Sequence, residues 1–186
     1  MKRFLRAALA VAFVVTPTAP ARAQTRPPKI FNDKGACPFE CCQYRRWKAE
    51  KTTAAYARPD RRSRRVGRFV AGQNVQALTG EVHTSPARYV VRNARKGYRP
   101  GDVLWVYTYL GEEFFKVWFR GRMREADLEI GTPAPTYYPT CKDNPNCFGE
   151  MHGGWRSTWW VKIKSPAGWV GWTDEPENFS GAAGCG

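Results

Sequence analysis

The sequence predicts a mainly β protein: a small barrel with an inserted β-hairpin and a long disulfide-pinned loop. Two strand–turn–strand patterns rich in tryptophan and valine support this fold class. Six cysteines in a chain that begins like an exported protein support the disulfides. Several shorter β-type runs precede the first hairpin pattern.

Residues 1–23 have the pattern of a secretory signal peptide. A basic start is followed by the apolar run Ala7–Val15, which is too short to span a bilayer. Ala21–Ala23 is a small-x-small cleavage triplet. We expect Sec-type export to the periplasm or the exterior, with cleavage after Ala23. The alternative is an uncleaved N-terminal anchor.

The predicted mature chain is strongly basic. Residues 1–23 contain four basic and no acidic residues, so their removal lowers the net charge from +14 to +10. The remaining length suits one domain with a sizeable core. A basic exported protein is attracted to anionic envelope surfaces or acidic proteins. Nucleic acid fits the charge but not the compartment, so we expect no nucleic-acid partner.

The cysteines predict disulfides, because their number is even and all follow the predicted cleavage site. The five residues between Cys141 and Cys147 favour a turn, and therefore a local bridge. Cys185 is expected to tie the C-terminus to the N-terminal cysteine cluster, and such a long closed loop stabilises a fold by about 2–5 kcal/mol. A zinc site is the alternative, but the cluster lacks a matching second pair of ligands, so we predict no metal and no cofactor. The candidate disulfide cysteines are Cys37, Cys41, Cys42, Cys141, Cys147 and Cys185.

Residues 24–47 are predicted to be a cysteine-rich lead-in, and residues 48–180 to be the β domain. The lead-in begins with a flexible segment, Gln24–Gly35, and Pro38 is expected to open a single helical turn. The first short strands of the β domain are predicted at Lys51–Tyr56, Val66–Val70, Asn74–Thr79 and Arg88–Arg92.

Arg58–Arg68 contains six arginines and one acid, and its Pro59–Asp60 pair favours a turn. We expect an exposed loop with a strong positive field. One interpretation is a solvated loop that aids solubility. The other is an anion-binding site, because the planar guanidinium suits bidentate capture of phosphate or carboxylate. The candidate anion-binding residues are Arg61, Arg62, Arg64 and Arg65.

The first strong hairpin pattern pairs Val103–Leu110 with Glu113–Phe119. The loop Gly111–Glu112 begins with glycine, which favours a type II′ turn. Nearly every position is β-branched or aromatic, so both faces need cover or a partner. Arg122–Ile130 has weak helical potential, and residues 131–158 are predicted to be a long loop that contains one cysteine pair.

The second strong hairpin pattern spans Trp159–Trp172. Val161 and Ile163 alternate with more polar positions, Ser165–Gly168 supplies a turn, and the partner strand follows. Gly171 in that strand allows another backbone or ring to approach closely. The chain then ends in a predicted tail, of which residues 181–186 lie beyond the β domain.

Five short segments resemble the bacterial SH3-like (SH3b) domain family. They are Tyr56–Asp60, Val66–Phe69, Gly72–Val75, Trp160–Ile163 and Gly168–Val170. The resemblance implies an SH3-like small barrel interrupted by an insertion at about residues 82–156. Two partly interleaved barrels are the alternative. It also implies a non-catalytic module that holds its parent protein at the cell wall or to a partner.

Aromatic residues next to basic ones favour binding over catalysis. Eight tryptophans and eight tyrosines exceed what one small core can bury, so some rings are expected to form stacking surfaces. We expect Trp105 and Trp118 in the core. The candidate ligand-binding rings, which flank the long loop, are Tyr137, Tyr138, Trp155, Trp159 and Trp160.

The sequence contains none of the common catalytic or phosphate-binding motifs. Of its two histidines, His83 and His152, only the second lies near a cysteine, and a bridged Cys147 cannot act as a nucleophile. We therefore predict a non-enzymatic exported module that recognises peptidoglycan or a partner protein. The alternatives are a small exported hydrolase that uses Cys147 and His152, and an anion-binding protein that uses Arg58–Arg68.

Overall fold

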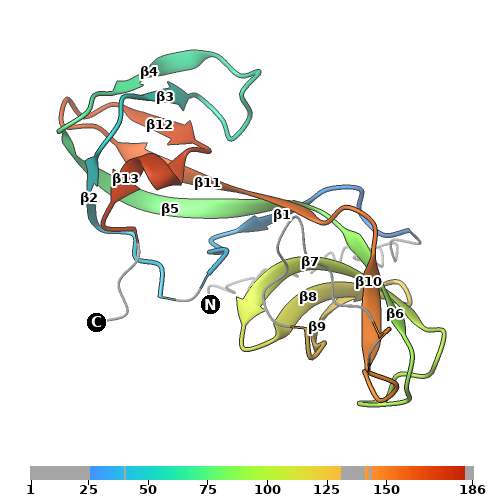
Figure 1. The fold of residues 1–186 in the computed structure, drawn as a ribbon. Helices are drawn as coiled ribbons and strands as arrows, with labels where there is room; N and C mark the ends of the chain where they lie inside the picture. The colour runs from blue at the N-terminus through green and yellow to red at the C-terminus, as the bar shows by residue number, and fades with distance from the viewer. Residues whose placement is uncertain (1–25, 40, 131–140, 143, 183–186) are drawn as a thin grey trace, which may run out of the picture.

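The structure is a computed structural model that describes residues 26–39, 41–130, 141–142 and 144–182. The predicted signal peptide, Tyr137, Tyr138 and Cys185 lie outside the described residues. The described part of the chain forms thirteen strands in two sheets and one short 3-10 helix, which confirms a mainly β fold (Figure 1). The strands are β1 (Phe31–Lys34), β2 (Arg46–Ala49), β3 (Thr53–Tyr56), β4 (Arg65–Phe69), β5 (Asn74–Ser85), β6 (Ala87–Val91), β7 (Val103–Gly111), β8 (Phe114–Phe119), β9 (Arg122–Asp127), β10 (Gly149–His152), β11 (Arg156–Lys164), β12 (Val170–Thr173) and β13 (Phe179–Ser180), with the helix at Pro176–Asn178.

The first sheet has eight strands and curls into a half-barrel. Its order is β13-β2-β5-β11-β12-β3-β4, and β1 pairs with the second half of β5. Alternate residues of these strands point inward, since the strand period is two. The buried core they form includes Trp47, Phe69, Val161 and Ile163. The opposite, outer face carries exposed polar and basic side chains such as Arg46, Gln76 and Lys164.

The second sheet has five strands, in the order β10-β6-β7-β8-β9, and a core of its own. The predicted hairpin at Val103–Phe119 forms its centre as β7 and β8. Tyr89, Leu104 and Phe115 are completely buried in this core. Trp118 is buried as expected, whereas Trp105 is only partly buried.

The C-terminal hairpin is confirmed as β11 and β12, with Lys164 opposite Val170. The turn is closed by the N–H of Gly168, which donates to the carbonyl of Ser165 at 3.0 Å. Gly168 has φ +90°, a region that glycine enters without strain. Gly171 lies against the side chains of Ala55 and Val66, which confirms the close approach expected there.

The turn between β7 and β8 differs from the prediction. Gly111 ends β7, and the two loop residues are Glu112 and Glu113, with φ values of +47° and +67°. Two positive φ angles are typical of a type I′ turn, not the type II′ turn expected from the glycine. The pairing of Gly111 with Phe114 fixes this register.

Several segments predicted to be irregular are strands. Phe31–Lys34, expected to be flexible, pairs with β5, and Phe179–Ser180 in the expected tail pairs with β2. Gly149–His152 forms a strand within the predicted long loop. No helical turn follows Pro38 in the described residues. Each of these three strands pairs with a strand that is distant in the sequence. The local sequence pattern therefore did not indicate that a strand forms there.

The weak helical potential of Arg122–Ile130 is not realised, because Arg122–Asp127 is the edge strand β9. The other short strands agree with prediction, except that β5 continues beyond Thr79 to Ser85. Gly80 does not end this strand. A Cβ at that position would lie 2.4 Å from both Trp159 Nε1 and the Tyr44 hydroxyl, so glycine there allows two aromatic side chains to pack on the backbone.

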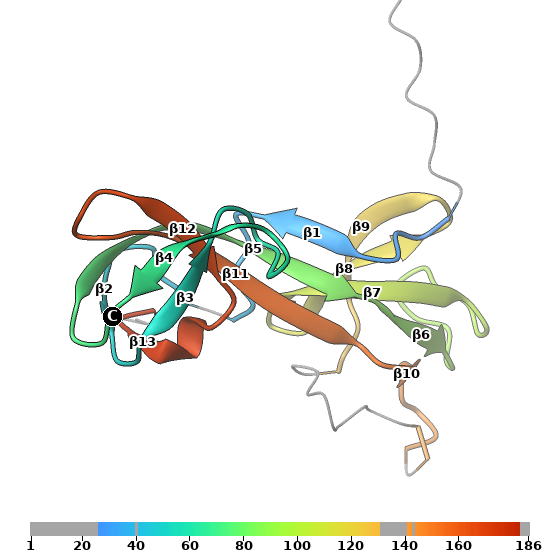
Figure 2. The same ribbon diagram turned by 90° about the horizontal axis from the view of Figure 1, so that it is seen from above.

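Two long strands connect the sheets. β5 and β11 pair along their length and run side by side from the half-barrel toward the second sheet (Figures 1 and 2). β1 adds contacts across the junction, where the Lys116 ammonium lies 2.7 Å from the buried Asp33 carboxylate. The Tyr107 hydroxyl donates to the Pro28 carbonyl at 2.6 Å, and burial raises the pKa of Tyr107 to about 12. These contacts fix the position of one sheet on the other.

Gly171→Ala should destabilise the protein by about 1–3 kcal/mol, as overpacking does in a filled core. The new Cβ would lie 2.8 Å from the Ala55 Cβ and 2.9 Å from Val66 Cγ2. Urea unfolding followed by tryptophan fluorescence measures the change. Gly154→Ala is the matched control, because its Cβ would meet only Arg156 Nε at 3.9 Å. Equal free energies of unfolding for the two variants would contradict this packing.

Lys116→Met should lower the free energy of unfolding by about 2–4 kcal/mol, because it leaves the Asp33 carboxylate buried without a cation. Asp33 is 7% exposed and Lys116 29% exposed, so the loss is smaller than for a fully buried pair. Adding Asp33→Asn should recover much of the stability. A single variant as stable as the natural protein would show that the ion pair does not join the sheets.

Candidate functional site

A groove of about 710 Å³ lies between the loop that joins β3 to β4 and the outer face of the first sheet. We call this loop, residues 57–64, the arginine loop. The side of the groove opposite the loop is formed by β1, β5 and β11, and the segment after β12 contributes an acid. The lining residues are Ile30, Asn32, Arg58, Pro59, Asp60, Arg61, Arg62, His83, Thr158, Trp160 and Asp174.

The floor of the groove is built by strand register. Asn32 on β1 lies opposite His83 on β5, and His83 lies opposite Thr158 on β11. Directly paired residues point to the same face of a sheet, so these three polar side chains form one row. Trp160 is two residues beyond Thr158 and therefore occupies the next position on that face.

The arginine loop is held in one conformation by Ser63, which is 9% exposed. Its hydroxyl donates to the Arg58 carbonyl and accepts from the Arg58 N–H, both at 3.1 Å. The Ser63 N–H donates to the Asp60 carbonyl at 2.9 Å, and the Asp60 carboxylate accepts from the Arg62 N–H at 2.8 Å. The loop is therefore shaped before any ligand arrives.

Two arginines of the loop are paired within the protein. Arg61 Nε donates to the Asp174 carboxylate at 2.7 Å, and its NH2 lies 3.3 Å from Glu175. Arg62 pairs with Asp60 at 3.0 Å and is 91% exposed. Hydrogen bonds from Arg62 hold the pKa of Asp60 below its usual value.

Arg58 differs from the other two arginines of the groove in its lack of an ion-pair partner among the described residues. It is exposed, and it forms no ion pair with any acid in the described part of the chain. Arg61 is paired with Asp174 and Glu175, and Arg62 with Asp60. Arg58 is therefore the groove arginine left available to an anionic ligand.

The inner end of the groove contains a histidine–glutamate pair beside a tryptophan. His83 Nε2 lies 2.6 Å from Glu81 Oε1, with side chains 18% and 10% exposed. The His83 and Trp160 rings have centroids 6.3 Å apart, and Tyr56 meets the Trp160 ring edge-on at 6.1 Å. These contacts hold His83 and Trp160 in fixed orientations.

The predicted exposure of three aromatic rings is wrong. Trp155, Trp159 and Trp160 are only 8%, 7% and 5% exposed. The indole N–H of Trp155 donates to the Tyr107 carbonyl at 2.8 Å, and that of Trp159 to the Tyr44 hydroxyl at 3.2 Å. Trp155 and Trp159 are therefore packed and hydrogen-bonded inside the protein, and Trp160 is buried. Of the three, only Trp160 lines the groove.

The four predicted anion-binding arginines divide into two pairs. Arg61 and Arg62 line the groove, whereas Arg64 and Arg65 are exposed outside it. The Arg65 guanidinium lies 5.9 Å from the centre of the Tyr56 ring. Sequence analysis missed Asn32, His83, Thr158 and Asp174 as groove residues. They join the site only through strand pairing and the return of the chain after β12.

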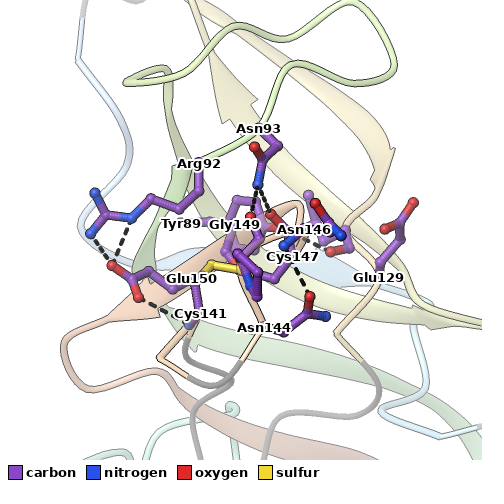
Figure 3. The surroundings of a disulfide bond; sticks show 12 residues. Tyr89, Arg92, Asn93, Glu129, Cys141, Asn144, Asn146, Cys147, Gly149 and Glu150 are labelled. Carbon is purple, nitrogen blue, oxygen red and sulfur yellow. Dashed lines mark hydrogen bonds and ion pairs between the residues drawn. A yellow bond between two sulfur atoms is a disulfide. The ribbon is translucent and has the colours of Figure 1, made fainter.

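The predicted Cys141–Cys147 disulfide is confirmed (Figure 3). A second disulfide joins Cys37 to Cys42. Asn93 donates to the Cys147 carbonyl at 2.7 Å, which holds the bridge against the end of β6. The Glu150 carboxylate accepts hydrogen bonds from the Arg92 side chain and from the Cys141 N–H, and both lower its pKa. The disulfides indicate an oxidising extracellular or periplasmic environment.

The hydrolase alternative lacks its nucleophile in this structure. The Cys147 sulfur is bonded to Cys141, and His152 lies 3.2 Å from Glu150 instead. None of the described cysteines is free. Within the described ranges, no group of three or more His, Cys, Asp or Glu side chains could hold a metal ion, and no helix is long and apolar enough to cross a membrane.

No protein-family model matches the chain, and neither the curated proteins nor the solved structures include one similar to it.

Denatured, unreduced protein should show no reaction of Cys37, Cys42, Cys141 or Cys147 with a thiol reagent, because all four are bridged. Mass mapping after alkylation identifies any modified cysteine. Reduction before alkylation should label all four and serves as the positive control. Labelling of Cys147 without reduction would restore the thiol hydrolase as a candidate.

Proposed function

We propose that the protein is an exported, non-catalytic binding module that recognises peptidoglycan through the groove beneath the arginine loop. The observation that best supports this proposal is the unpaired charge of Arg58 beside the row of polar side chains Asn32, His83 and Thr158. The groove volume is within the range of pockets that hold small ligands or polymer segments.

The groove offers a partner for each chemical group of a peptidoglycan strand. Such a strand presents sugar rings, amides and the carboxylates of its peptide stems. Arg58 suits the carboxylates, because an arginine–carboxylate pair forms two charge-assisted hydrogen bonds. Asn32 and Thr158 suit the amides and hydroxyls. Ile30, which is 61% exposed, supplies apolar surface for a sugar face.

We also propose that the first sheet is a divergent SH3-like barrel, interrupted at about residues 82–156. The curled shape of the sheet and the pairing of β3 with β4 and of β11 with β12 support this proposal. The export signal proposed for residues 1–23 and the two disulfides fit a protein that meets the cell wall.

A second candidate function is the binding of anions without selectivity for a glycan. The composition of Arg58–Arg68 favours it. Competition separates the two functions. Soluble muropeptides should displace the protein from peptidoglycan at concentrations where inorganic phosphate of equal charge does not.

Exchanging Arg58 and Arg62 together for glutamine should weaken co-sedimentation with purified peptidoglycan at least about tenfold, a loss of about 1.4 kcal/mol. Both arginines line the groove, and neither makes a buried contact that the fold requires. The matched control is the pair Lys51→Gln and Arg68→Gln. These residues are also exposed and basic, but they do not line the groove.

Binding should also weaken as salt rises from low to physiological concentration, because exposed charges are screened. If the groove variant and the control pair bind peptidoglycan equally, the groove is not the site. If the natural protein fails to sediment with peptidoglycan at any salt concentration, peptidoglycan is not the ligand.

A further inference from the structure

The geometry points to a second anion-binding site on the outer face of the first sheet, where β2, β5 and β11 lie side by side. A cavity of about 490 Å³ lies there. Its lining residues are Arg46, Asn74, Val75, Gln76, Lys164, Ser165 and Pro166. We infer that this site binds a carboxylate or phosphate. Resting on the proposed function, we infer further that it holds a second acidic group of the peptidoglycan strand in the groove.

Strand register places two cations on either side of an amide. Arg46 lies opposite Gln76, and Gln76 lies opposite Lys164, so the three residues form one row across adjacent strands. Neighbouring strands are about 4.8 Å apart, which puts the Arg46 and Lys164 backbones about 10 Å apart. Two long basic side chains at this spacing can converge on one anionic group.

The charge of this row is not neutralised by the protein. Arg46 and Lys164 are exposed, and no acid in the described residues forms an ion pair with either. No acidic residue lines the cavity. In contrast, Arg61 and Arg62 of the groove are both paired with carboxylates. Of the two sites, this one leaves the larger share of its cationic charge for a ligand.

Ser165 provides an independent sign of a missing partner. It lines the cavity and is 6% exposed, yet its hydroxyl has no hydrogen-bond partner among the described residues. Buried hydroxyls in folded proteins are nearly always hydrogen-bonded, so an unpaired one needs an explanation. A bound oxyanion would accept this hydrogen bond once the Ser165 side chain turns its buried hydroxyl toward the cavity.

A β-bulge places the second site and the groove on the same face. Gln76 and His83 are both on β5, and their residue numbers differ by an odd number. In a regular strand, two such residues would point to opposite faces. Leu78 is an extra residue between the Ala77–Ile163 and Thr79–Lys162 pairs, and it restores the alternation. The two sites are then about 20 Å apart along the strand, a span that one extended polymer covers. Binding at both sites raises the affinity for the polymer above that for its fragments.

Titration of ¹⁵N-labelled protein with inorganic phosphate tests the site without reference to peptidoglycan. The backbone amide signals of Gln76, Lys164 and Ser165 should shift together and saturate. In the double variant Arg46→Gln with Lys164→Gln, the affinity should fall at least about fivefold, whereas Lys51→Gln with Arg68→Gln should titrate like the natural protein. Absence of saturable shifts, or equal shifts in the double variant, would overturn the second site.

Ser165→Ala guards against a variant that fails only because it is misfolded. It removes the unpaired hydroxyl, so its melting temperature should equal or exceed that of the natural protein. Its phosphate affinity should nevertheless fall about threefold. Unchanged phosphate affinity in a folded Ser165→Ala protein would show that this hydroxyl does not contact the anion. That result would contradict the proposed anion site.

Co-sedimentation with peptidoglycan separates this inference from the proposed function. The Arg46→Gln, Lys164→Gln variant should bind peptidoglycan about fivefold more weakly, yet bind single-stem muropeptides like the natural protein. If its binding to peptidoglycan is unchanged, the link between the sites is wrong and the proposed function stands. If the natural protein binds no peptidoglycan but phosphate still maps to Ser165, the proposed function is wrong and the second site stands. Full displacement by single-stranded DNA of equal charge would overturn the assignment to a glycan.

Discussion

The antiparallel ladder between β5 and β11 is the constraint on which the remaining structure depends. It extends from Arg156 opposite Ser85 to Lys164 opposite Gln76. Its first part supports β1 and the floor of the groove, and its last part supports β2 and the row of basic residues. The inward residues of the same strands fill the core of the half-barrel. One ladder therefore sets both the hydrophobic packing and the spacing of the outer polar groups.

Features encoded by local sequence could be predicted. Both strong hairpins form where the alternation of apolar residues and the turn residues indicated, and the arginine loop follows from its composition. The Cys141–Cys147 bridge follows from close spacing around a turn. Local sequence patterns gave wrong predictions where the same residue is compatible with more than one turn type. Gly111 suggested one turn type, but the ladder register moved the loop to the two glutamates that follow it.

Features created by pairing between distant segments could not be predicted. Phe31–Lys34 is a strand only because β5 offers a free edge, and Asn32, His83 and Thr158 meet only in the assembled sheet. The aromatic count exceeded one small core, and the surplus was expected at the surface. The chain instead builds two cores, and these bury Trp155 and Trp159.

The path of the chain between the sheets has a consequence for the history of the protein. Residues 86–155 leave and rejoin the half-barrel at Ser85 and Arg156, which face each other as partners in the ladder. A chain without those residues would need only a tight turn between the two to keep the half-barrel connected. The second sheet is thus inserted at one point of the half-barrel, between two paired residues. Gene rearrangement at that point can add, remove or exchange the second sheet without changing the strand connections of the first.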